Sequence, residues 1–288
     1  MKLASPKQNF QDWFTQQWAI FWGKEIESND VPWLMGAFGK PGAKADDFIH
    51  EIAKDKVLEI ERNTASNGLL ASIQDLNFSS EEYNRLSKNV VDFYEKTADY
   101  ELSFAVKWNP FFKFFGKLIN YLFSNRINQL NVPTNNFESS NQIKSEIIRL
   151  VNPESKEVKY TVWYRTFEST QQVLYSGIYS TCELPSGKTC IKAVFPLPNG
   201  NATVIMTPSV GVNGELLLIS SGKKFGDAGF YFLLNDSKGR FWSQYIRSFQ
   251  DRLIVSSVGE KLVATQKLTL WNLRVLEFQY EIKRKGED

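Results

Sequence analysis

Hydrophobic and polar positions follow two different periods along this 288-residue chain. Before residue 100, apolar residues recur at helical spacing in residues 8–23, in DDFIHEIAKDKVL and in FSSEEYNRLSKNVVDFYEKTA. In the last segment, Ser79 or Ser80 followed by a glutamate is typical of a helix start. From residue 100 onward, short apolar or alternating runs separated by Gly, Pro and Asn predict strands that pair with their sequence neighbours.

This order predicts an α+β protein in which N-terminal helices precede a large curled antiparallel β-sheet or β-barrel, lipocalin-like in general architecture. An open flat sheet of about ten strands would leave long free edges, which closure removes. We expect residues 1–130 to form a mainly helical region that packs on the barrel or plugs it. Residues 143–284 should form the barrel-like region, and one integrated domain is the alternative.

Two segments carry more specific expectations. Residues 110–123 are apolar around most of a helix, which predicts a buried segment, a dimer contact or a lid. The basic residues near them keep a membrane-surface role open, although we do not favour it. In residues 190–208, Asn199-Gly200 predicts a type I′ hairpin whose tip stands clear of the barrel rim.

The amino-acid composition limits which kinds of binding partner we expect. The 34 Lys and Arg residues balance 32 Asp and Glu residues, so the net charge of +2 does not favour nucleic acid. No secretory signal and no apolar run long enough for a spanning helix is evident, so we expect a cytoplasmic protein. Aromatic residues make up 14% of the chain, which fits a ring-packed core or an apolar ligand pocket.

Few catalytic patterns are present. A histidine-based site would have to use His50, the single histidine, which lies on an expected helix and is interpreted as structural. We expect no metal and no cofactor, and we assign no catalytic residue. Cys182 and Cys190 flank a turn that would set them opposite each other. We interpret them as reduced, and a disulfide stays open.

Three strand segments combine an arginine with apolar residues on one face. Arginines in this setting either lie outside, which is the commoner case, or anchor a ligand inside a cavity. Facing inward, they would suit an amphiphile with an acidic head, with Asp227 and Asp251 as further polar groups. The candidate ligand-binding residues are Trp163, Arg165, Tyr175, Tyr179, Tyr245, Arg247 and Arg274.

Several segments resemble a family of uncharacterised bacterial proteins. They are WYRTF, VLYSGIYSTCEL, FPLPNGNAT and GKKFGDAGFY, which match the family's RT, YSGxYSxC, FPLPNGNAT and GKxFGDxGFY elements. The family has no established activity. The resemblance therefore implies a bacterial source and a shared fold, and it implies no substrate.

We favour noncatalytic binding of an apolar or amphipathic small molecule in a barrel cavity. One alternative is an enzyme that works without histidine and uses Asp227, Tyr231 or an arginine cluster. The other is a membrane-peripheral or protein-interaction module that presents residues 110–123. The oligomeric state is not predicted.

Overall fold

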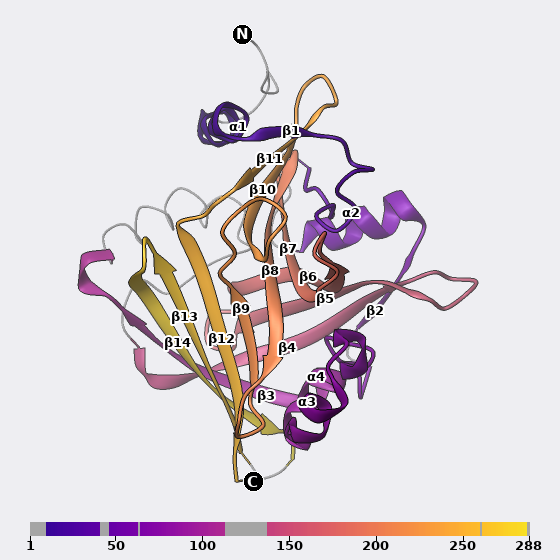
Figure 1. Ribbon diagram of the computed structural model, residues 1–288. Coiled ribbons are helices and arrows are strands. Elements are labelled where there is room, and N and C mark those ends of the chain that lie inside the picture. Colours follow the sequence, from indigo (N-terminus) through magenta and orange to yellow (C-terminus); the bar gives the residue numbers. More distant parts are fainter. Residues whose placement is uncertain (1–9, 41–45, 63, 113–136, 260, 287–288) are drawn as a thin grey trace.

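The protein is described here from a computed structural model that covers residues 10–40, 46–62, 64–112, 137–259 and 261–286. Its helical elements precede most of the strands (Figure 1). They are α1 (Phe10–Trp22), α2 (Asp47–Lys56), α3 (Ser80–Arg85), α4 (Lys88–Glu95) and the short 3-10 helices η1 (Ile73–Leu76) and η2 (Thr97–Asp99).

The segment expected as one helix near residues 80–97 forms two helices. Ser79 caps α3 and exchanges capping hydrogen bonds with Glu82, which confirms the predicted start. The break before α4 arises because the Ser87 amide donates to the Gly214 carbonyl at 2.9 Å. This contact with a distant turn replaces a bond within the helix.

Ten antiparallel strands close into a barrel, which confirms the predicted fold class. The order is β8–β7–β6–β5–β4–β3–β14–β13–β12–β9, and β9 pairs again with β8. The strands are β3 (Tyr100–Trp108), β4 (Phe137–Val151), β5 (Val158–Phe167), β6 (Val173–Glu183), β7 (Thr189–Leu197), β8 (Gly200–Val210), β9 (Leu216–Ser220), β12 (Phe249–Val258), β13 (Lys261–Leu270) and β14 (Leu273–Arg284).

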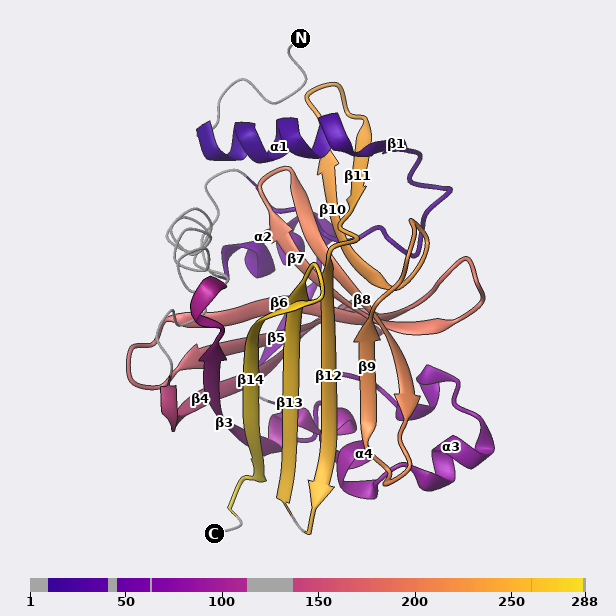
Figure 2. The same cartoon turned by 60° about the vertical axis from the view of Figure 1, so that its left-hand side comes forward.

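A side sheet branches from the barrel at β8. Residues 200–205 of β8 pair with β10 (Gly229–Asn235), whereas residues 207–210 pair with β9. The side sheet continues through β11 (Phe241–Tyr245) to β1 (Lys24–Ile26), and α1 lies across it (Figure 2). A short strand, β2 (Glu59–Arg62), pairs with β4.

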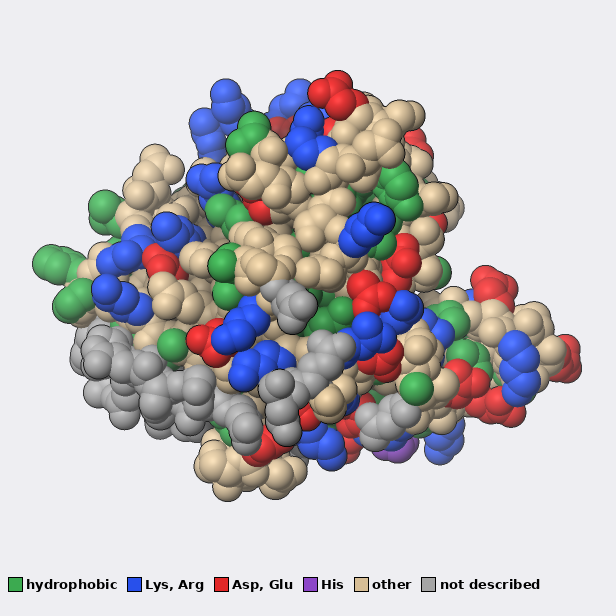
Figure 3. All heavy atoms as spheres, turned by 90° about the horizontal axis from the view of Figure 1, so that it is seen from below, with side chains coloured by type: hydrophobic (Ala, Val, Ile, Leu, Met, Phe, Trp, Pro, Cys, Tyr) green, Lys and Arg blue, Asp and Glu red, His purple; other side chains and the backbone are tan. Residues whose placement is uncertain are grey.

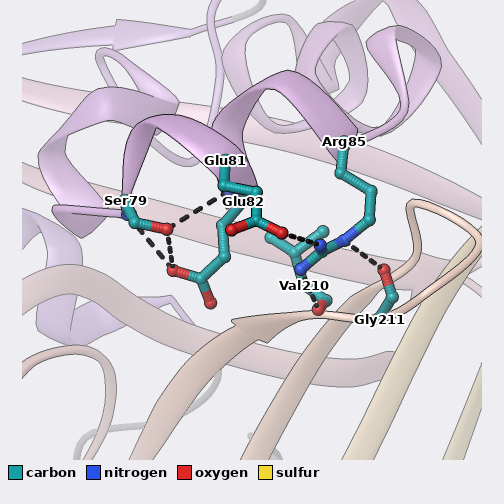
Figure 4. A network of polar contacts seen from close by, with 6 residues as sticks. All are labelled: Ser79, Glu81, Glu82, Arg85, Val210 and Gly211. Atoms are coloured by element: carbon teal, nitrogen blue, oxygen red, sulfur yellow. Dashed lines mark hydrogen bonds and ion pairs between the residues drawn. The ribbon is translucent and has the colours of Figure 1, made fainter.

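Helices α3 and α4 lie at one end of the barrel (Figures 1 and 2). Val90 and Phe93 of α4 are buried in the same hydrophobic cluster as the inward-facing residues of the barrel strands. Arg85 holds α3 to the β8–β9 turn, since its guanidinium donates to the carbonyls of Gly211 at 3.0 Å and Val210 at 3.3 Å (Figure 4). From this end, the surface shows acidic and basic side chains interspersed (Figure 3).

The hairpin tip at residues 198–200 is covered, so the expectation that it stands clear of the rim is wrong. Asn199 has φ 57°, but Gly200 is not among the glycines with positive φ. Glycine is required there because a Cβ would lie 2.2 Å from the Leu233 carbonyl oxygen of β10. The Gly39 amide also donates to the Leu197 carbonyl at 3.0 Å. The tip is therefore packed between the N-terminal loop and the side sheet.

Candidate functional site

Alternation along β5 directs one set of side chains into the barrel. Trp163 and Arg165 face inward, while Val162 and Tyr164, on the opposite face, pack in the cluster formed with α2. Tyr175 lies directly across from Arg165 on β6. The structure therefore brings together four of the candidate ligand-binding residues: Trp163, Arg165, Tyr175 and Tyr179.

Arg165 is a buried cation that has no carboxylate partner among the described residues. It is 6% exposed, and its guanidinium lies 3.9 Å from the Trp163 ring centroid and 4.8 Å from that of Tyr175. It donates to the Tyr179 hydroxyl at 3.4 Å. Within the described part of the chain, its Nε has no hydrogen-bond partner and its guanidinium has no salt bridge. Aromatic faces and hydroxyls therefore solvate this charge.

A chain of polar side chains extends from Arg165 across the barrel interior. The Arg165 guanidinium interacts electrostatically with the hydroxyl of Tyr280 of β14, and this hydroxyl donates to Gln266 Oε1 at 3.5 Å. Gln266 of β13 in turn donates through Nε2 to an Asp251 carboxylate oxygen at 2.7 Å. A buried basic group and a buried acidic group are therefore connected through two neutral side chains.

Asp251 lies at the far end of this chain and is 5% exposed. Burial raises the pKa of its carboxyl to about 7, and the hydrogen bond from Gln266 opposes that rise. The carboxylate oxygen that does not contact Gln266 has no hydrogen-bond partner among the residues that the structure describes. Burial also raises the pKa of the Tyr175 and Tyr179 hydroxyls. These two phenols stay neutral at physiological pH and act as hydrogen-bonding groups.

Helix α4 covers one end of the barrel interior, and inward-facing side chains at the other end, named here the open end, keep accessible surface. On β13, the inward-facing Leu262 and Ala264 are buried near α4, whereas Gln266, Leu268 and Leu270 keep accessible surface. Other partly exposed side chains that pack on the interior cluster are Phe167, Tyr175, Tyr179, Phe195, Phe230 and Leu253.

The remaining candidate residues lie outside the barrel interior. Arg247 is exposed in the turn between β11 and β12, in a segment that we expected to be strand. Arg274 is exposed because a bulge between Leu268 and Thr269 shifts the register against β14. Tyr245 packs against Tyr231 of the side sheet, with ring centroids 4.9 Å apart. The three arginines do not converge on one site.

Asp227 and Tyr231, the residues named for the enzyme alternative, make structural contacts. Asp227 accepts hydrogen bonds from the Lys223 and Lys224 amides at 2.9 and 3.2 Å, and Tyr231 belongs to a cluster outside the barrel. His50 is exposed on α2. Beyond Phe112, residues 110–123 lie outside the described residues. The described part of the chain holds no group of three His, Cys, Asp or Glu that could bind a metal.

The two cysteines lie directly opposite each other on β6 and β7, as the turn length predicts. Both are free. Burial raises the pKa of the Cys182 thiol to about 12 and also raises that of Cys190. Such thiols are protonated and weakly nucleophilic at neutral pH.

Sequence reasoning missed Gln266 and Tyr280, which complete the polar chain. Both occupy inward positions in alternating runs, Gln266 between Ala264 and Leu268, and Tyr280 between Phe278 and Ile282. A polar residue at an apolar position of such a run is the signal that identifies Gln266. Tyr280 is aromatic and cannot be separated from core residues by this pattern.

Comparisons with known proteins add one relative. No family model matches the chain, and no solved structure matches it significantly. The chain is 25% identical over 270 residues, or 92% of its length, to the uncharacterized membrane protein YndJ of Bacillus subtilis (strain 168). The matched region is 46% of that protein, so the chain spans less than half of its relative. Within the described residues, no helix has the length and apolar character needed to cross a bilayer.

Proposed function

We propose that this protein binds a small amphipathic molecule inside the barrel and has no catalytic role. The ligand's acidic group would pair with Arg165, and its apolar part would lie along the partly exposed rings toward the open end. The observation that carries the proposal is the guanidinium of Arg165, which is buried and finds no carboxylate partner in the described ranges of the chain. Burying an ion without a counter-ion is costly, so a bound anion would compensate that cost.

Three further features support this kind of ligand. A barrel of eight strands is either filled by its own side chains or holds one small ligand, and this barrel has ten strands and is therefore wider. The free oxygen of Asp251 would accept a hydrogen bond from a second polar group of the ligand. The relative's name places that protein in a membrane, which agrees with a ligand of lipid character. We propose a cytoplasmic location, where the two free thiols would stay reduced.

The first test is native mass spectrometry of gently purified protein, followed by organic extraction of any released molecule. A stoichiometric amphiphile with an acidic group would support the proposal. The second test is calorimetric titration with dodecanoic acid and with dodecanol, which has the same chain length without the charge. The acid should bind about 10 to 100 times more tightly than the alcohol if Arg165 pairs with the carboxylate.

Two variants test whether the acid binds at Arg165 or unspecifically elsewhere on the protein. Arg165→Met should reduce the preference for the acid over the alcohol to near unity. Arg274→Met removes an exposed arginine by the same substitution and should leave that preference unchanged. Equal affinity of the wild-type protein for the acid and the alcohol, or an equal effect of both variants, would contradict the proposal.

A further inference from the structure

The open end of the barrel carries exposed apolar side chains that do not contribute to the core. We name Phe111, Trp271 and Leu273 the apolar rim. They are 93%, 69% and 58% exposed. Hydrogen bonds hold this region together, since the Asn109 amide donates to the Val275 carbonyl at 3.0 Å and the Asn109 side chain donates to the Arg274 carbonyl at 2.9 Å. The rim lies at the opposite end of β13 and β14 from α4 (Figure 2).

Trp271 occupies a position that neither burial nor backbone preference explains. It forms the β13–β14 turn together with Asn272, and both residues have positive φ, 50° and 64°. Glycine, asparagine and aspartate suit such turns, whereas positive φ is unfavourable for a bulky side chain. An exposed tryptophan in this conformation is better explained by contact with a surface outside the chain.

The outer face beside the rim is basic. Lys107, Arg247, Arg252, Lys267 and Arg274 are all exposed there, on β3, β12, β13, β14 and the β11–β12 turn. Among the described residues, Glu277 lies between these cations, with Lys267 at 3.7 Å and Arg274 at 3.5 Å. Five cations therefore accompany one largely buried carboxylate, although the whole chain is close to neutral.

We infer that the apolar rim and its basic flank dock on the surface of an anionic phospholipid bilayer. Tryptophan is enriched at membrane interfaces, and clustered Lys and Arg residues bind anionic headgroups. This arrangement turns the open end of the barrel toward the lipid. The inference does not depend on ligand binding inside the barrel.

The test is co-sedimentation of the full chain with vesicles of phosphatidylcholine alone or mixed with phosphatidylserine. We expect binding to the mixed vesicles that weakens at high salt, because surface charges are screened. Trp271→Asn should weaken binding about tenfold or more while the fold is kept, since asparagine tolerates the turn. The double variant Arg247→Gln and Arg252→Gln should weaken it about 25-fold, from about fivefold for each cation.

Matched controls lie at the opposite end of the barrel. Val258 is 63% exposed and Lys283 is exposed there, so Val258→Ser and Lys283→Gln should leave vesicle binding unchanged. Circular dichroism would verify that each variant is folded. Absence of binding to phosphatidylserine vesicles would overturn the inference, and so would binding that the rim variants and the controls reduce equally. Equal binding to both kinds of vesicle would also overturn it.

Discussion

Replacing Asp251 by asparagine should remove a pH-dependent loss of stability. The Asp251 carboxyl is 5% exposed, and burial raises its pKa from an ordinary value of 3.8 to about 7. Asparagine has nearly the same shape and retains an oxygen that accepts the hydrogen bond from Gln266 Nε2. The substitution therefore removes the ionisation while the contact is kept.

The sign follows from proton binding in the two states. Below pH 4 the carboxyl is protonated in both the folded and the unfolded chain, so it contributes no pH dependence. Between pH 4 and pH 7 the unfolded chain releases this proton and the folded chain keeps it, so the free energy of unfolding falls as the pH rises. Above pH 7 both states are ionised, and the loss is complete.

The size of the effect follows from the same two pKa values. The difference between 3.8 and about 7 corresponds to about 4 kcal/mol between pH 4 and pH 8. Urea unfolding of the wild-type protein and of Asp251→Asn across this range gives two curves of unfolding free energy. Their difference isolates Asp251, because the other titrating groups cancel. Asp251→Asn should gain about 4 kcal/mol relative to the wild type as the pH is raised.

A difference that does not change with pH would refute this reasoning. It would mean that Asp251 has an ordinary pKa and is therefore accessible to water or paired with a cation. A carbon-13 NMR titration of the Asp251 carboxyl provides an independent measurement, with an expected midpoint about 3 units above that of an exposed aspartate.

Two further predictions concern the barrel end that α3 and α4 cover and the pair of cysteines. Gly214 has φ 81°, and a Cβ there would lie 2.6 Å from the Arg85 carbonyl oxygen, so Gly214→Ala should destabilise the protein by about 2–3 kcal/mol in urea unfolding. Gly239→Ala is the control, because Gly239 also has a positive φ of 77° but a Cβ there would meet no atom within 4 Å. It should lower the free energy of unfolding by about 1 kcal/mol. Equal losses in the two variants would show that the contact with the Arg85 carbonyl contributes nothing. Iodoacetamide at pH 8 should label Cys182 and Cys190 much more slowly in the folded than in the unfolded chain, because burial raises both pKa values. Rapid labelling of the folded protein would show that these thiols are accessible.

Most of the strands from β5 onward could be predicted because alternating runs and turns with Gly, Pro or Asn encode them locally, and the direct pairing of Cys182 with Cys190 follows from one short turn. The start of β4 was not predicted, since this strand begins at Phe137, six residues before the expected start of the barrel region at 143. Closure could not be predicted in the same way. It depends on β8, which pairs with β10 along its first half and with β9 along its second half. No local pattern in β8 marks this change of partner.

Whether an arginine side chain points into or out of the barrel depends on features that lie outside its own strand. Arg165 faces inward because α2 covers the opposite face of β5. Arg274 has a similar local pattern and faces outward because one bulge shifts its register against β13. The alternation rule is therefore correct for both strands, but it determines orientation only after the bulges and the covering helix are known.

The polar chain inside the barrel depends on the closed fold as a whole. Arg165 lies on β5, Tyr280 on β14, Gln266 on β13 and Asp251 on β12, and these strands come together because β3 and β4 connect the two halves of the barrel. If the fold alone were selected, apolar side chains of similar size would fill these positions at lower cost, since buried ions contribute little to stability. The unpaired guanidinium of Arg165 and the free oxygen of Asp251 are therefore the features on which the proposed ligand binding rests. The barrel interior is therefore the first place to look for a ligand.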